Sequence, residues 1–197
     1  MDEQEMIETA FDDLIKSLRK GTTEESVKMI RRAFEFAREA HQGVRRKSGE
    51  PYILHPLAVA KIAVKEIGLG TKSAVAALLH DVVEDTDYTV EDIANLFGPK
   101  IASLVDGLTK ISEVMGSNTT KQAESFRKMI LTLADDVRVI LIKIADRLHN
   151  MRTLKYMKPE KQKEKARETM EIYAPLAQRL GISKIKIELD DLALKYL

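Results

Sequence analysis

The chain has 197 residues, of which 44% are hydrophobic and 32% are charged, and its formal net charge is +1. This length suits one folded domain with its own core, and a charge so close to zero argues against a general nucleic-acid-binding surface. The chain has no cysteine, so disulfides and thiolate metal sites are excluded and any metal must be held by nitrogen and oxygen atoms. The acidic first five residues do not resemble a secretory signal, and the apolar runs fall well short of the roughly 20 residues that cross a bilayer. We therefore expect a cytoplasmic protein that does not bind membranes.

Apolar residues recur with helical spacing along nearly the whole chain, whereas alternating strand patterns of useful length are missing. The sequence therefore predicts an all-α fold. The expected helices cover residues 4–19, 22–40, 56–68, 71 to beyond 80, 89–97, 99–114, 120–133, 136–150, 160–180 and 183–197.

Local signals fix some of these boundaries. Thr22 with Glu25, and Thr89 with Asp92, have the spacing of helix-capping residues. Glycines and a proline within residues 41–52 predict a loop, and the polar stretch 115–120 predicts a mobile connection that could order when a ligand binds.

The most informative stretch is HDVVEDT, residues 80–86, which follows the apolar run AVAALL. On a helix that continues through Asp85, a turn of about 100° per residue places His80, Asp81, Glu84 and Asp85 on one face. An imidazole beside a carboxylate can bind a divalent metal, and carboxylates one turn later can move a proton of water. A solvent-exposed helix end is the alternative explanation.

Another histidine, His55, stands directly before Pro56. Proline disfavours the helical conformation in the residue before it, so we expect His55 to be extended at the start of a helix. A surface or capping role is the alternative for this side chain.

Asp146 interrupts a strongly apolar helix, and a buried carboxylate needs a partner, which Lys143, Arg147 or a metal could provide. Asn150 and Thr153 lie three residues apart on the same helix and could bind one ligand, or simply face solvent. The basic loop at residues 45–49 could neutralise an anion near His55, although such charges usually face solvent.

Together, the segments GEPYILHP (49–56), HDVVEDT (80–86) and KIADRLHNMRTL (143–154) resemble the hydrolase domain of RelA/SpoT homologues, the stringent-response proteins that make and destroy ppGpp and pppGpp. The resemblance covers essentially the whole chain and extends through YAPLAQRLGI (173–182). It implies an HD-domain phosphohydrolase, built as a helical bundle, that releases pyrophosphate from the 3′-diphosphate of these alarmones and leaves GDP or GTP.

The same resemblance implies roles for individual residues. The metal ligands would be His55, His80, Asp81 and Asp146, and the family implies manganese, although the ligand types leave iron, cobalt and zinc open. Glu84 and Asp85 would act on the attacking water. The nucleotide would contact Arg46, Lys47, Ser48, Asn150 and Thr153.

The expected organisation is a single domain over residues 1–197, the N-terminal part of a longer protein, with residues 183–197 starting a linker helix towards a synthetase domain absent from this chain. Its partners would be the alarmone and further domains in cis. Competing interpretations are a phosphohydrolase for another nucleotide, such as NADPH or a deoxynucleotide, a module that binds the alarmone without turnover, and a helical scaffold.

Overall fold

The computed structural model describes residues 2–117, 130 and 136–197, and these residues form helices and connections without a single strand. The all-α prediction is therefore confirmed for them. The elements in chain order are α1 (Glu3–Lys16), α2 (Glu24–Ala40), α3 (Leu54–Lys61), η1 (Ile62–Ile67), α4 (Thr71–Leu79), α5 (Val82–Asp85), α6 (Val90–Phe97), α7 (Pro99–Ser117), α9 (Val137–Arg152), η2 (Leu154–Tyr156), α10 (Pro159–Glu168), η3 (Thr169–Tyr173), α11 (Ala174–Arg179) and α12 (Ser183–Leu194). Within the described ranges, no helix combines the length and hydropathy needed to cross a membrane.

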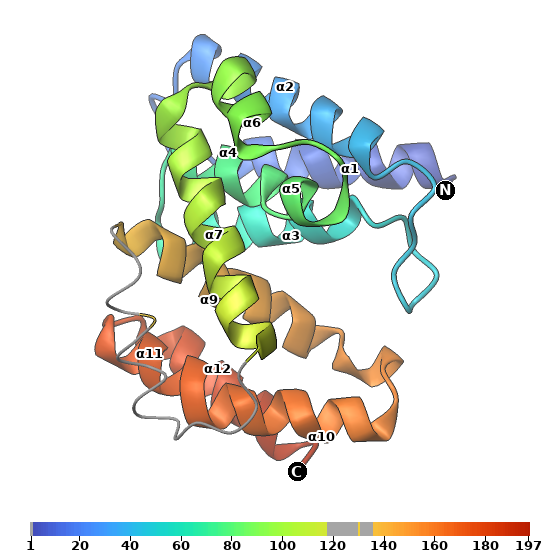
Figure 1. Cartoon of the computed structure of the whole chain (residues 1–197), viewed down its shortest axis with the longest axis vertical. Helices are drawn as coiled ribbons and strands as arrows, with labels where there is room; N and C mark the ends of the chain where they lie inside the picture. The colour runs from blue at the N-terminus through green and yellow to red at the C-terminus, as the bar shows by residue number, and fades with distance from the viewer. Residues whose placement is uncertain (1, 118–129, 131–135) are drawn as a thin grey trace.

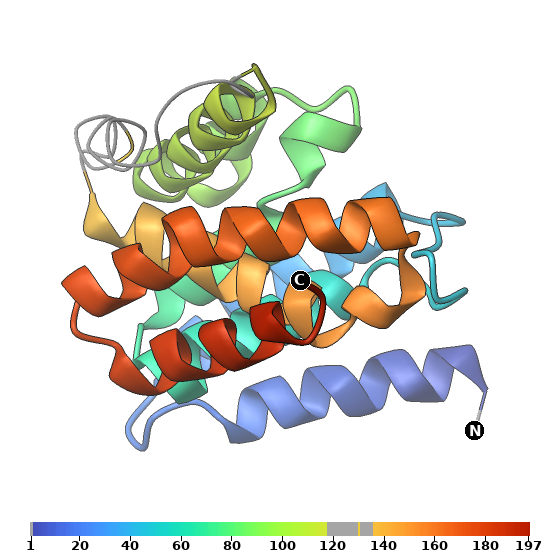
Figure 2. The same cartoon turned by 90° about the horizontal axis from the view of Figure 1, so that it is seen from below.

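The helix α4 is the centre of the fold. All of its residues from Ser73 to Leu79 are buried, and it contacts α2, α3, α7 and α9. Figure 1 shows α1, α2 and α6 towards one end of the molecule and α10, α11 and α12 at the other. Helix α12 contacts α9, α10 and α11, and Figure 2 shows it beside the segment that α10 begins. A helix that is apolar on every side has to be surrounded in this way, so the residues at its end are held deep inside the protein.

The polar end of α4 differs from the prediction of one continuous helix. The helix stops at Leu79, and Glu84 and Asp85 stand on the separate single turn α5. The Nδ1 atom of the His80 side chain lies 2.5 Å from the carbonyl oxygen of Ala77, which is the acceptor that the amide of Asp81 would use in a continuing α-helix. This side-chain contact replaces the backbone bond, so the helix breaks between His80 and Val82.

His55 is also placed differently. It lies inside the first turn of α3 rather than in an extended segment, and its amide donates to the carbonyl of Tyr52 at 2.9 Å. The helix begins two residues earlier than predicted, at Leu54. Pro56 is tolerated because it still falls in the first turn, where an N–H would have no helical partner.

Helix caps explain two further boundaries. The capping box of Thr89 and Asp92 is present, as predicted. The cap of α2 is Thr23, which accepts from the amide of Ser26, whereas the hydroxyl of Thr22 donates to the carbonyl of Arg19. The predicted cap at Thr22 was therefore wrong by one residue, because two adjacent threonines offer the same local signal.

The later helices agree with the predicted spans, with one exception. Helix α7 continues to Ser117, so the predicted connection at 115–120 is helical in its first half, and its second half lies outside the described residues, as does most of the helix expected at 120–133. The expected helix 160–180 is formed by α10, η3 and α11 in succession. Pro175 follows the wide turn η3, which accommodates its missing N–H.

Candidate active site

Three helices bring together a buried group of possible metal ligands. One ligand atom from each of His55, His80 and Asp146 lies within 4.8 Å of the others. The residues come from the start of α3, the end of α4 and the middle of α9, and the structure buries all three. Long-range packing thus brings together three of the four predicted ligands, whose nitrogen and oxygen atoms suit a divalent first-row metal, while Asp81 lies beside His80 and outside this group.

The ring of His80 points one free nitrogen into this group. Because a carbonyl can only accept, the contact with Ala77 fixes the proton on Nδ1. The buried Nε2 atom has no hydrogen-bond partner of acceptable geometry, yet it lies 3.0 Å from Asp81 and 3.4 Å from Asp146. An orphaned ring nitrogen facing two carboxylates is an arrangement that a cation would satisfy, so the residues fit a metal.

The electrostatics lead to the same conclusion. Burial acts to lower the pKa of His80, but the Asp81 and Asp146 carboxylates outweigh it and raise the pKa well above its ordinary value. Burial also acts to raise the pKa of Asp146, and Lys143, His55 and His80 outweigh it and hold the pKa well below its ordinary value. The group therefore favours one positive charge beside ionised carboxylates, and a proton or a metal ion can supply it.

His55 connects this group to a third imidazole. Its Nε2 lies 2.7 Å from Asp146 Oδ1, and its Nδ1 lies 2.7 Å from Nδ1 of His149. Burial, with His55 and Arg46 nearby, lowers the pKa of His149 to about 3, so this ring is neutral near pH 7. If Nε2 of His55 binds a metal, the ring proton must be on Nδ1, from which His55 would donate to the neutral ring of His149, and this outer hydrogen bond would orient the ligating imidazole.

The sequence offered Lys143, Arg147 or a metal as the partner of Asp146. In the structure Asp146 contacts Lys143 and also belongs to the group of metal-ligand atoms. Lys143 lies 3.5 Å from Asp146 Oδ2 and also donates to Ser112 at 3.0 Å. Arg147 instead pairs with Glu168 and lies over the ring of Tyr173 at 4.4 Å, so it links α9 to the C-terminal helices. Lys143 balances the charge of Asp146, whereas Arg147 is structural.

Tyr52 is a site residue that sequence reasoning missed. Its hydroxyl donates to Asp81 Oδ2, and burial together with Asp81 raises its pKa, so the phenol stays protonated. The residue is one turn before His55 in the GEPYILHP segment, and this spacing was the available signal. The hydroxyl holds the Asp81 carboxylate in position beside His80.

Glu84 and Asp85 lie next to this group without lining the open cavity. Burial raises the pKa of both carboxyl groups, and Asp81 adds to the effect. A hydrogen bond to Ser112 and the charge of Lys143 oppose the shift at Glu84. A carboxylate with a raised pKa is suited to exchange a proton near neutral pH.

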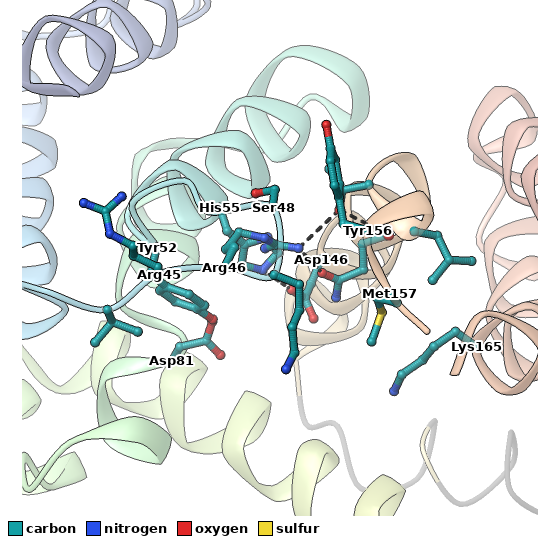
Figure 3. A pocket seen from close by; sticks show the side chains of 15 residues that line it. Arg45, Arg46, Ser48, Tyr52, His55, Asp81, Asp146, Tyr156, Met157 and Lys165 are labelled. Atoms are coloured by element: carbon teal, nitrogen blue, oxygen red, sulfur yellow. Dashed lines mark hydrogen bonds and ion pairs between the residues drawn. The ribbon is translucent and has the colours of Figure 1, made fainter. Parts of the chain in front are cut away.

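A cavity of about 740 Å³ opens from the metal-ligand group, which is a suitable size for a nucleotide. All five predicted nucleotide contacts line it. Arg46 donates to Asn150 at 3.1 Å and to Thr153 at 3.2 Å, so the basic loop meets the end of α9 across the cavity (Figure 3). The lining residues are Val44, Arg45, Arg46, Lys47, Ser48, Tyr52, His55, Asp81, Asp146, Asn150, Thr153, Leu154, Tyr156, Met157 and Lys165.

Sequence reasoning missed most of the wall formed by Leu154, Tyr156, Met157 and Lys165. The first three follow Thr153 directly, so their proximity in sequence was a usable signal. Lys165 lies on α10, where lysines also occur at 161 and 163, and no local pattern distinguishes the one that faces the cavity.

Comparison with known proteins identifies the family of the chain. A family model described as HD domain matches residues 33–183. Over 170 residues the chain is 56% identical to a probable guanosine-3′,5′-bis(diphosphate) 3′-pyrophosphohydrolase of Synechocystis, a match that covers 86% of this chain and 22% of that protein. It is 49% identical over 188 residues to the bifunctional (p)ppGpp synthase/hydrolase SpoT of Escherichia coli, covering 95% of this chain and 27% of that protein.

A solved structure is similar as well. It is described as a metazoan ortholog of SpoT that hydrolyzes ppGpp. The two structures superpose with a TM-score of 0.67 at 28% sequence identity, and the match covers 86% of this chain and 97% of that one. The chain thus spans about a quarter of the two curated bacterial relatives and nearly the whole length of the metazoan structure. With more than half of its residues matched by the family model, the chain belongs to the HD domain family.

Proposed function

We propose that the chain is a metal-dependent hydrolase that removes pyrophosphate from the 3′-diphosphate of ppGpp and pppGpp. The observation that carries the proposal is the buried group of His55, His80 and Asp146 at one end of a cavity lined by basic residues. The names of the bacterial relatives and the metazoan ortholog point to the same substrate class. A site of this kind offers a metal for the diphosphate and cations for the rest of the nucleotide.

In this proposal His55, His80, Asp81 and Asp146 hold one divalent first-row ion, for which their imidazole nitrogens and carboxylate oxygens are suitable donors, and we take it to be manganese because the family resemblance implies that metal. When bound, the ion would polarise the diphosphate and make water more acidic. The rest of the site is already arranged around the ligands. Tyr52 and His149 fix the orientation of two ligands, and Lys143 balances the charge of a third.

Residues of this chain would also remove a proton from the attacking water and bind the nucleotide. Glu84, with Asp85 beside it, takes the proton of the attacking water, since burial has raised the pKa of both. Water adds to the phosphorus next to the ribose, and the bond from this phosphorus to the 3′ oxygen breaks. Pyrophosphate is released, and the 3′ oxygen leaves as a hydroxyl with the proton that Glu84 took from the water. The five residues assigned to the nucleotide are Arg46, Lys47, Ser48, Asn150 and Thr153.

We also propose that residues 1–197 form one hydrolase domain of a longer protein that has a synthetase domain after it. Two features support this. The curated relatives are about four times as long, and one is named as bifunctional. Helix α12 packs against α9 and α11, so the first part of the proposed linker is also part of the folded domain.

The direct test measures pyrophosphate released from ppGpp by protein stripped of metal, before and after manganese is restored. Parallel assays with iron, cobalt and zinc identify the ion that supports turnover, and NADPH and deoxynucleoside triphosphates test the competing substrates. Release only with metal, and only from the alarmones, is the expected result. Binding of ppGpp without turnover under every metal condition would instead indicate a binding module.

A further inference from the structure

The wall of the cavity formed by α10 carries a lysine to which the proposed function has assigned no role. Lys165 lines the cavity, and Figure 3 shows it on the side away from Tyr52 and Asp81. Its backbone carbonyl accepts from Thr169 at 2.7 Å and from Arg147 at 3.5 Å. The Thr169 contact lies within the same helical segment, and the Arg147 contact joins this point of α10 to α9, so the backbone that carries the lysine is held by the fold.

The ammonium group of Lys165 makes no hydrogen bond or ion pair with any residue that the structure describes. The acids nearest to it in sequence are engaged elsewhere, because Glu164 pairs with Lys161 and Glu168 pairs with Arg147. Burial lowers the pKa of Lys165, and the neighbouring Arg147 contributes to the shift. A partly desolvated cation of this kind gains most from an anionic ligand in the cavity.

The other charges of the cavity are separated along it. Asp81 and Asp146 belong to the metal-ligand group, and Arg45 is bound to Glu3 by two hydrogen bonds of 2.7 and 2.9 Å. Arg46 is held by Asn150 and Thr153. Lys47 also lines the cavity, on the same loop as Arg46, and it is exposed. A nucleotide whose 3′-diphosphate lies at the metal has its 5′-phosphates at some distance from it, where the half-buried Lys165 on the α10 wall offers them a cation.

We propose that Lys165 binds the 5′-phosphate groups of the substrate and so favours nucleotides that carry phosphate at both the 3′ and the 5′ positions. This inference rests on the proposed function, and it names a specificity residue that acts on binding rather than on the chemical step. An interaction made equally in the ground and transition states changes KM and leaves kcat unaltered.

The test compares Lys165→Met and Lys165→Arg with the wild-type chain on ppGpp and on guanosine 3′-diphosphate, which has a 5′ hydroxyl. Lys163→Met, at an exposed position of the same helix, is the matched control. We expect Lys165→Met to raise KM for ppGpp by about ten-fold or more, the size of one charge-assisted hydrogen bond, with kcat unchanged. KM for guanosine 3′-diphosphate should stay the same, and arginine should restore most of the affinity for ppGpp.

An equal rise of KM for both nucleotides, or no rise for ppGpp, would overturn the assignment, and thermal melting of each variant shows whether it is folded. Calorimetric binding of the same two nucleotides separates this inference from the proposed function. If the wild-type chain releases no pyrophosphate, the proposed function fails. A preference for ppGpp in binding that Lys165→Met abolishes would still support the phosphate contact, and equal binding of the two nucleotides would reject it.

Discussion

The two ends of the cavity are built on different principles. At the metal end, the ligands come from three packed helices, and the side chains of His55 and His80 are only 3% and 4% exposed. Each ligand there also has a second partner behind it, such as the carbonyl of Ala77 or the ring of His149. At the nucleotide end, the contacts come from one loop and the end of α9, and Lys47 is exposed.

Because of this difference, we expect substitutions at the two ends to change different properties of the enzyme. Removing a group from the metal end leaves buried charges without partners, which costs far more than the lost contact itself. Removing a group from the nucleotide end exposes its neighbours to water, which can replace the missing partner. We therefore expect changes at the metal end to affect the reaction itself, and changes at the nucleotide end to affect affinity.

The largest effect is expected for His80→Ala or Asp81→Ala. Either change removes one of the proposed ligands. Loss of His80 also removes a positive partner of Asp146, and loss of Asp81 removes a carboxylate that faces His80. Hydrolysis should fall to background and bound metal should be lost with it. Metal content measured by mass spectrometry alongside pyrophosphate release checks this, and normal values of both in either variant would show that the ligand assignment is wrong.

The next largest effect is expected for Glu84→Gln. This change keeps the shape of the side chain but removes the base, so kcat should fall by about 10² to 10⁴. Metal content should stay near that of the wild type, because Glu84 is proposed to act on the attacking water and not to bind the ion. Single-turnover rates and metal analysis on one sample separate this outcome from ligand loss, and loss of the metal would mean that Glu84 is a ligand.

The pH dependence of kcat sharpens this assignment. A base works only when deprotonated, and burial raises the pKa of Glu84 above its ordinary value of 4.5. Activity should therefore rise with pH through this raised pKa, and the rising limb should disappear in Glu84→Gln. A limb that persists unchanged in the variant would point to Asp85 as the base.

The metal end could be predicted from the sequence because its residues stand in three distinctive motifs. His55, His80 and Asp146 were named from these motifs, and the fold brings them together. The local conformations were less predictable. An apolar run predicts that a helix continues, but it does not show that the side chain of His80 will take the carbonyl of Ala77 and end the helix.

The nucleotide end could be predicted only in part. Arg46, Asn150 and Thr153 were identified, and the structure connects them by hydrogen bonds. Lys165 at this end, and Tyr52 at the metal end, were missed because their roles depend on contacts between distant segments. The hydroxyl of Tyr52 reaches Asp81 from 29 positions away, and Lys165 lines the cavity from α10, a helix that Arg147 of α9 holds through Glu168.

A smaller effect, again at the metal end, is expected for Tyr52→Phe. Losing the hydroxyl leaves Asp81 without its positioning hydrogen bond, which should weaken metal affinity by about 10- to 100-fold. Tyr156→Phe is the matched control, since that residue also lines the cavity but is 48% exposed. Competition with a metal chelator measures the affinities, and equal values for the two variants would remove Tyr52 from the support of the site.

The smallest effect is expected for Arg46→Ala, at the nucleotide end. A guanidinium lying against a base contributes about 0.5–2 kcal/mol, or about 2- to 30-fold in affinity, so KM should rise within that range while kcat changes little. Arg45→Ala is the control, because Arg45 also lines the cavity but is bound to Glu3 and the carbonyl of Gly49.

Arg46→Lys then tests the form of the contact. Lysine keeps the charge but loses the planar group that stacks on a base and reaches Asn150 and Thr153 together. If Arg46 recognises the base, lysine should behave like alanine, and if it holds phosphate, lysine should restore most of the affinity. A fall in kcat with constant KM would instead place Arg46 at the reacting diphosphate, and the division between a chemical end and a binding end would not hold for this residue.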